Sequence, residues 1–132
     1  MDLKREVLRH MVATVAYRGG LAIVDASENF TAFRAHETTR TPGEILAHIG
    51  DLLEGSLYLV KGEMVYLTSA PLPWKEEITR FFSAVKALDA YLASDAPLAC
   101  PVEKLEAQIS RESGFRKLYH ELEFFGVCPA CA

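Results

Sequence analysis

The sequence predicts an all-α protein, a bundle of about four amphipathic helices that form a single domain over residues 1–132. Apolar residues recur at spacings of three and four along most of the chain, which is the period of a helix with one buried face. Proline and glycine fall between these periodic segments, and no segment of useful length alternates as a half-buried strand does. Half of the 132 residues are apolar, enough to bury a core without disulfides or a structural metal.

The first helix is predicted from about Leu3 to Ala26, with Asp2 as its N-cap. Gly19 and Gly20 lie inside it, but apolar residues follow them. We therefore expect the helix to continue through a weak centre, at a cost of ~1 kcal/mol per glycine relative to alanine. Its apolar stripe, which is expected to face the core, comprises Leu3, Val7, Leu8, Met11, Val12 and Val15.

Two irregular segments separate the first three helices. The polar stretch 29–40 is predicted to be a loop that Phe30 and Phe33 hold against the core. Pro71 and Pro73 break the chain again before the third helix.

The second helix has the clearest start in the chain. Thr41 is its predicted N-cap, Pro42 takes the first helical position, and Glu44 completes a capping box with the threonine. The helix is predicted to run to about Lys61, and Gly62 is placed to cap it in a left-handed conformation. Its predicted core face comprises Ile45, Leu46, Ile49, Leu52, Leu53 and Leu57.

Two further helical regions follow. The third helix is predicted from about Trp74 to Ser94, and its apolar face comprises Ile78, Phe81, Phe82, Val85, Leu88 and Leu92. A last helical region is predicted to be interrupted near Ser113 and Gly114, as one bent helix or as two. Its apolar positions are Leu105, Ile109, Phe115, Leu118, Tyr119, Leu122 and Phe125. Helices of about 20 residues span ~30 Å, so a bundle is the natural way to bury four such faces.

Charge and cysteine usage limit the partners and the compartment. The net charge of −4 and the pI near 5.6 provide no basic field, which disfavours nucleic acid and an anionic membrane surface as partners. The charged N-terminal residues are not followed by an unbroken apolar segment of the kind found in a secretory leader or a membrane span, and three cysteines do not make a secreted disulfide framework. We therefore expect a cytoplasmic protein with reduced thiols.

Residues 40–53 read RTPGEILAHIGDLL, and this segment resembles the second helix of the DinB-like four-helix-bundle family. Residues 16–20, AYRGG, resemble the glycine pair in the first helix of that family. The third helix of the family is matched by Phe81-Phe82 and by residues 87–93, ALDAYLA. The similarity extends from Met1 to about Leu105.

The resemblance implies an up-and-down bundle with an unusual helix order, frequently a homodimer. In this family histidines from different helices often hold a divalent metal such as nickel or zinc, and some members are thiol-dependent transferases, isomerases or hydrolases. By that resemblance His48 matches the metal histidine of the second helix. The other ligands of the family are a histidine pair four residues apart on the last helix. In this chain His120 matches the first histidine of the pair, and Phe124 stands where the second would be. Residues 110–132 match the family poorly.

The residues themselves leave two interpretations of each histidine open. On a helical wheel His48 lies at the edge of the apolar face, on the side of Glu44 and Asp51. It is therefore either a metal ligand, or a boundary histidine that is bonded to one of these carboxylates or simply solvated. His120 points away from the apolar arc of the last helix and is expected to face solvent. If Phe124 marks a second buried face, His120 and Glu123 join His48 in a nitrogen, nitrogen, oxygen ligand set.

The other polar residues are weaker candidates for a catalytic or metal site. His10 and His36 are expected at the surface, and Glu54, Glu63 and residues 75–77 are expected on solvated helix faces or termini, which leaves no isolated carboxylate pair for acid–base catalysis. The motif CPAC at Cys128–Cys131 is typical of a zinc knuckle or a redox pair. It follows the C-terminal end of a predicted helix, where the dipole does not favour thiolate, so a reduced tail is the favoured interpretation.

Three functional hypotheses follow. The first is a DinB-like bundle with a partial divalent-metal site at His48 and a thiol-linked activity that the sequence does not assign. The second is a non-catalytic dimeric module that has lost the metal ligands and holds an apolar ligand between its helices. The third makes CPAC a zinc clip across a dimer.

Overall fold

The structure, a computed structural model, describes residues 2–99, 110–112 and 114. Within these residues all regular secondary structure is helical and no strand is present, which confirms the all-α class. The elements are α1 (Leu3–Ile23), the 3-10 helix η1 (Glu28–Ala32), α2 (Pro42–Val60) and α3 (Trp74–Ala93). Met1–Cys100 form one compact unit, apart from Pro101–Ala132. Because most of the second unit lies outside the described residues, the single domain stays a prediction.

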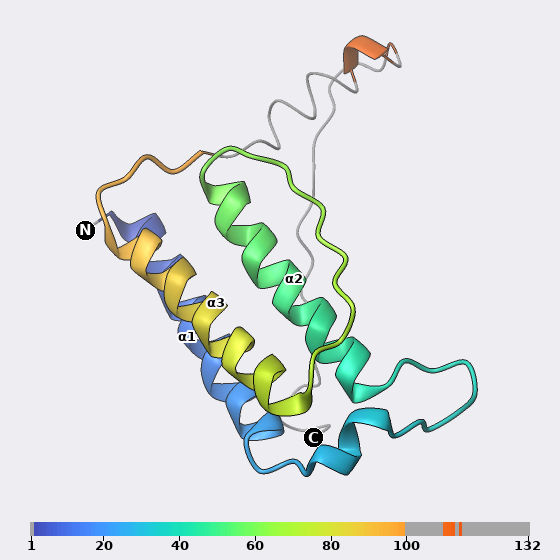
Figure 1. The fold of residues 1–132 in the computed structure, drawn as a ribbon. Coiled ribbons are helices and arrows are strands. Elements are labelled where there is room, and N and C mark those ends of the chain that lie inside the picture. Colours follow the sequence, from blue (N-terminus) through green and yellow to red (C-terminus); the bar gives the residue numbers. More distant parts are fainter. Residues whose placement is uncertain (1, 100–109, 113, 115–132) are drawn as a thin grey trace, which may run out of the picture. The chain divides into compact units, whose positions relative to one another are not determined.

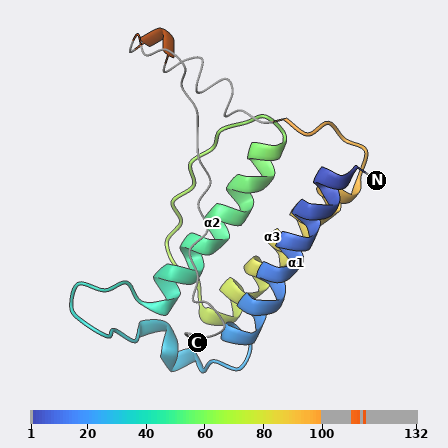
Figure 2. The same cartoon turned by 180° about the vertical axis from the view of Figure 1, so that it is seen from behind.

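The three long helices are organised around α3. The backbones of α1 and α2 each pack against α3 but not against each other (Figure 1). The helices α2 and α3 run in the same direction, so residues 61–73 return along the outside of the pair, as the view from behind also shows (Figure 2). Helix α1 runs opposite to α3. The parallel α2–α3 pair departs from the strict alternation of direction in a simple up-and-down bundle.

Helix α1 begins as predicted and continues through both glycines. The Lys4 amide donates to Asp2 Oδ1 over 3.3 Å, and the helix ends at Ile23 rather than at Ala26. A Cβ atom on Gly19 would lie only 2.6 Å from Cζ of Phe81 on α3. Glycine is therefore needed here for close approach of the Phe81 ring, and its conformational cost is offset by packing.

Helix α2 confirms the capping signals. The Glu44 amide donates to Thr41 Oγ1 over 3.1 Å, and the Thr41 amide donates to Glu44 Oε2 over 2.6 Å. The helix ends at Val60, and Gly62 has a φ of +90°, the left-handed conformation expected of a C-terminal cap.

The predicted core faces of α1 and α2 were wrong at several positions. Ile45 and Leu52 on α2 are 46% and 57% exposed, and Leu3 and Val7 on α1 are also exposed. Helix α2 instead buries small and polar residues beside its leucines, namely Gly43, Leu46, Ala47, Gly50, Asp51 and Leu53. The reason lies on α3, which places an arginine side chain against this face of α2 and so requires small residues and a carboxylate there.

The core lies mainly on α3. Its buried residues form one cluster comprising Ile23, Leu46, Leu53, Trp74, Phe81, Ala84 and Val85. Leu88 and Leu92 are buried as predicted, whereas the Phe82 ring lies 39% exposed and meets Phe81 edge to face at 5.1 Å between centroids.

The segment before α2 is more ordered than a loop, because residues 28–32 form η1. The rings of Phe30 and Phe33 stack at 6.2 Å, and Phe30 meets the buried ring of Trp74 edge to face at 6.0 Å. Both phenylalanines are nevertheless exposed, so they contact the core only in part.

Beyond residue 99 the structure describes little. Residues 110–112 are helical, and Gly114 has a φ of +75° while its amide donates to the Ser110 carbonyl over 3.0 Å. This geometry agrees with the predicted interruption near Ser113 and Gly114. The other apolar positions of the last predicted helix lie outside the described residues.

Candidate functional site

An extensive polar cluster lies between α2 and α3 and is centred on Arg80. The guanidinium of Arg80 donates to Glu54 through Nε (2.9 Å to Oε1) and Nη2 (2.8 Å to Oε2), and Nη2 also donates to Asp51 Oδ1 over 2.6 Å. Its Nη1 donates to the Ala47 carbonyl over 3.2 Å. A Cβ on Gly50 would lie 3.0 Å from Cζ of Arg80, so the missing side chain at residue 50 leaves room for the guanidinium against α2.

The same cluster ties the returning segment 61–73 to the helices. Asp51 accepts from the Ser69 amide over 2.9 Å and from the Ser69 hydroxyl over 2.6 Å. Glu77, whose side chain is fully buried, accepts from the Leu72 amide over 2.9 Å and has Oε2 3.8 Å from Arg80 Nη1. Three carboxylates therefore surround one guanidinium, and two of them also hold the connection in place.

The electrostatics of the cluster favour the charged forms. Burial opposes ionisation of Asp51, but hydrogen bonds from Arg80 and Ser69 outweigh it, so the pKa of Asp51 lies below its usual value. The hydrogen bonds to Glu54 are the largest cause that raises the pKa of Arg80 above its already high value, against the opposing effect of burial. The Arg80 guanidinium is therefore permanently charged, and its role is to hold carboxylates rather than to exchange protons.

The expectation that Glu77 is solvated was wrong, whereas Glu54 is half-buried and only partly solvated. Glu77 is 1% exposed, and Glu54 forms a two-point ion pair with Arg80. A signal was present, because Glu77 falls within the three- and four-residue spacing that links Trp74 to Phe81 and so belongs to the buried face of α3. One oxygen of Glu77, Oε2, makes no hydrogen bond within the described residues.

The lowered pKa of Asp51 predicts a loss of stability in acid. A carboxyl whose folded pKa is lowered contributes stability that is fully present above its unfolded pKa and is lost as the pH falls through the folded pKa. We expect the free energy of unfolding to be steady near neutral pH and to fall below about pH 4, the ordinary range of aspartate. Urea titrations from pH 7 to 2.5 measure this. Asp51→Asn should be less stable at pH 7 and lose less on acidification; a loss equal to that of the unaltered protein would contradict the role of Asp51.

His48 lies on α2 beside the face that packs against Arg80, at the edge of a polar cavity of about 380 Å³. Its lining comprises Arg40, Glu44, His48, Asp51, Tyr66, Leu67, Thr68 and Ser69. His48 is exposed, and within the described part of the chain no hydrogen bond or ion pair engages its imidazole. The predicted position beside Glu44 and Asp51 at the edge of the buried face is what the structure shows.

The cavity offers few free metal ligands. Asp51 is committed to Arg80 and Ser69, and Glu44 accepts from the Thr41 amide and pairs with Arg34 at 3.5 Å. Within residues 2–99, 110–112 and 114, no three His, Cys, Asp or Glu side chains are grouped so as to hold a metal ion. The other predicted ligands, His120 and Glu123, lie outside the described residues, as do Cys100, Cys128 and Cys131.

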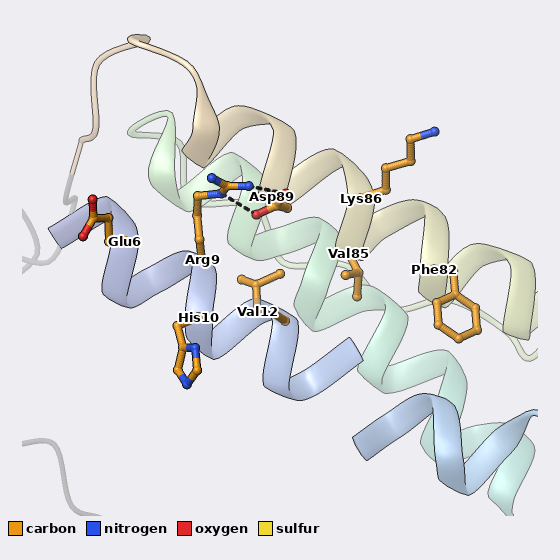
Figure 3. A pocket seen from close by; sticks show the side chains of 9 residues that line it. Glu6, Arg9, His10, Val12, Phe82, Val85, Lys86 and Asp89 are labelled. Atoms are coloured by element: carbon orange, nitrogen blue, oxygen red, sulfur yellow. Dashed lines mark hydrogen bonds and ion pairs between the residues drawn. The ribbon is translucent and has the colours of Figure 1, made fainter. Parts of the chain in front are cut away.

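A second, wider hollow of about 590 Å³ lies between α1 and α3 (Figure 3). Its lining comprises Glu6, Arg9, His10, Val12, Ala13, Phe82, Val85, Lys86 and Asp89. Across this hollow Arg9 donates two hydrogen bonds to the Asp89 carboxylate, of 2.7 and 3.1 Å. They hold the pKa of Asp89 below its usual value. The charged groups at its rim are of both signs, so the hollow has no strong preference for an anion or a cation.

A third feature is an apolar groove of about 310 Å³ whose sides are α1 and α2 and whose floor is α3. Its lining comprises Leu8, Met11, Val12, Val15, Leu53, Ser56, Leu59, Val60, Leu88 and Leu92. Among the described lining residues Ser56 alone bears a hydroxyl, and this hydroxyl already donates to the Leu52 carbonyl over 2.7 Å. An apolar helix face or an apolar ligand matches this lining.

Comparison with known proteins identifies no relative of this chain. No protein-family model, no curated protein and no solved structure matches the chain. Among the described helices, none is long and apolar enough to cross a membrane.

Proposed function

We propose that this chain is a DinB-like four-helix-bundle protein whose functional centre is the cavity at His48, with nickel or zinc as its metal. His48 is the proposed ligand from α2, and His120 and Glu123 are the proposed ligands from the last predicted helix. The observation that carries the proposal is the exposed imidazole of His48, which opens onto a polar cavity without a hydrogen-bond partner among the described residues. An imidazole without a hydrogen-bond partner has its ring nitrogens available for metal binding.

The described residues fit such a metal only in part, because one free donor is too few for a closed site. We therefore derive no catalytic step through the metal. The resemblance to the DinB-like family supplies the class of reaction proposed, thiol-dependent transfer, isomerisation or hydrolysis. It also supplies the proposed homodimer, and the cytoplasm is proposed from the sequence.

The bundle itself is proposed to have four long helices. The described part contributes three, of which α1 and α2 flank an apolar groove. The apolar spacing of residues 105–125 predicts the fourth, as one bent helix or as two, with an interruption near Ser113 and Gly114.

Metal analysis of the purified full-length protein tests the proposal. We expect near-stoichiometric nickel or zinc by inductively coupled plasma mass spectrometry, and we expect His48→Ala to lose most of it while its helical circular dichroism is unchanged. His36→Ala is the matched control, since the His36 ring contacts Thr38 in an exposed turn. A protein without metal that also refuses added nickel and zinc would sink the proposal. Loss of metal in Cys128→Ser/Cys131→Ser, but not in His48→Ala, would assign the metal to the zinc clip.

The apolar groove favours a second candidate, a non-catalytic module that holds an apolar ligand. Its lining is almost entirely aliphatic and combines all three long helices. A metal-free native protein that binds an environment-sensitive apolar dye, and loses that binding in Met11→Glu, would favour this module over the metal protein.

A further inference from the structure

Helix α1 is apolar on more than the side it buries. It meets α3 through Arg9, Gly19, Gly20 and Ile23, and the opposite side also carries large apolar residues. These residues are exposed to more than half of their full area, namely Leu3 (72%), Val7 (52%), Tyr17 (69%), Leu21 (67%) and Val24 (56%). A helix that is apolar on opposite sides is expected to be enclosed on both.

The exposed residues follow a heptad pattern. Positions 3, 7, 10, 14, 17, 21 and 24 alternate in steps of four and three, which is the seam along which two helices pair over their length. His10 and Thr14 are the two polar members, and both are exposed. His10 lies at the rim of the hollow between α1 and α3, and Figure 3 shows its ring directed away from α3. The Thr14 hydroxyl donates to the His10 carbonyl over 2.9 Å. We call these seven residues the α1 seam.

The first six residues of the α1 seam, from Leu3 to Leu21, have the same order of apolar and polar residues in both directions. From residue 3 to residue 21 it runs apolar, apolar, polar, polar, apolar, apolar, with its centre at residue 12. A second α1 laid antiparallel on the first therefore places Leu3 opposite the partner's Leu21, Val7 opposite the partner's Tyr17 and His10 opposite the partner's Thr14. Apolar meets apolar in the outer layers, and the two polar side chains meet at the centre.

We propose that the α1 seam is the interface of a symmetric homodimer in which the two α1 helices pack antiparallel. A self-complementary pattern on one helix is what an interface with two-fold symmetry requires, because each residue meets its counterpart twice. The antiparallel direction also sets each helix dipole against the reverse dipole of its partner. The inference rests on the proposed homodimer but is independent of metal at His48, which lies on α2.

Analytical ultracentrifugation of the full-length protein tests the seam. We expect a dimer, and we expect Leu21→Glu to raise its dissociation constant by about 100-fold, roughly tenfold for each of the two symmetry-related sites. Leu52→Glu is the matched control, because Leu52 is 57% exposed on α2, and it should leave the dimer intact. A monomeric protein would overturn both the homodimer and the seam. A dimer that Leu21→Glu does not weaken would overturn the seam alone.

Cysteine cross-linking tests the direction without relying on a destabilising variant. In chains whose native cysteines are replaced by serine, Val7→Cys and Tyr17→Cys protomers should cross-link with each other when mixed, and neither should cross-link with itself. Thr79→Cys, on an exposed position of α3, should give no cross-link with any of them. Cross-linking of Val7→Cys with itself would overturn the antiparallel arrangement.

Discussion

Replacing Arg80 with methionine is expected to lower the free energy of unfolding by about 3–5 kcal/mol, as for other buried ion pairs that lose one partner. The substitution retains most of the aliphatic volume but leaves Asp51, Glu54 and Glu77 without their shared cation. Asp51 and Glu77 are 6% and 1% exposed, so water cannot replace the guanidinium freely. The Ala47 carbonyl also loses its donor from Arg80. Chemical denaturation followed by circular dichroism measures the loss.

Two further variants make this result specific. Arg34→Met removes an arginine whose pair with Glu44 is exposed on both sides, and it should cost less than about 1 kcal/mol. Arg80→Lys retains the charge but not the planar fork that reaches Glu54 twice and Asp51 once, so it should fall between the unaltered protein and Arg80→Met. If Arg80→Met and Arg34→Met were equally mild, the cluster would not be a main source of stability.

Truncating Phe81 to alanine is expected to cost about 3–5 kcal/mol, the usual range for a large side chain removed from a core. Phe81 is 2% exposed and belongs to the central cluster of α3. Its ring also fills the space above Gly19 on α1, so the substitution weakens the α1–α3 contact as well. Thermal or urea unfolding of the variant measures the effect.

The Gly19 contact can be isolated by a double-mutant cycle. Gly19→Ala places a methyl group 2.6 Å from Phe81 Cζ, and overpacking of this kind costs about 1–3 kcal/mol, against ~1 kcal/mol gained in helix propensity. In a Phe81→Leu background the cost should shrink, because the ring that clashes is absent. Gly55→Ala is the matched control, since its methyl group would meet only the Val65 carbonyl at 3.6 Å. Equal costs in both backgrounds would show that Gly19 matters for another reason.

The helix starts and ends could be predicted because their signals are local. Thr41, Pro42 and Glu44 lie within one turn of each other, and Gly62 follows directly after the last turn of α2. Hydrogen bonds between neighbours in sequence decide such positions, so a single sequence contains the information.

The Arg80 cluster could not be predicted in the same way, because its members come from α2, α3 and the segment between them. Asp51 and Arg80 lie 29 positions apart, and only the parallel packing of α2 and α3 brings them together. The sequence marks both helices but not their relative direction. The core face of α2 was predicted wrongly for the same reason. Ile45 and Leu52 fit the apolar spacing of the sequence, whereas Gly50 and Asp51 are buried because they fit the side chains of α3.

The parallel arrangement of α2 and α3 has a consequence for how the chain reaches its fold. Neighbouring helices usually meet through a short turn, which lets them dock early as a hairpin. Here α1 and α2 do not pack backbone to backbone, and α2 meets α3 only after residues 61–73 have returned along their length. The Arg9–Asp89 pair closes a separation of 80 positions. The contact order therefore exceeds that of a simple bundle of helical hairpins. We expect slower folding, because the entropy of loop closure is lost before the stabilising contacts between distant residues form.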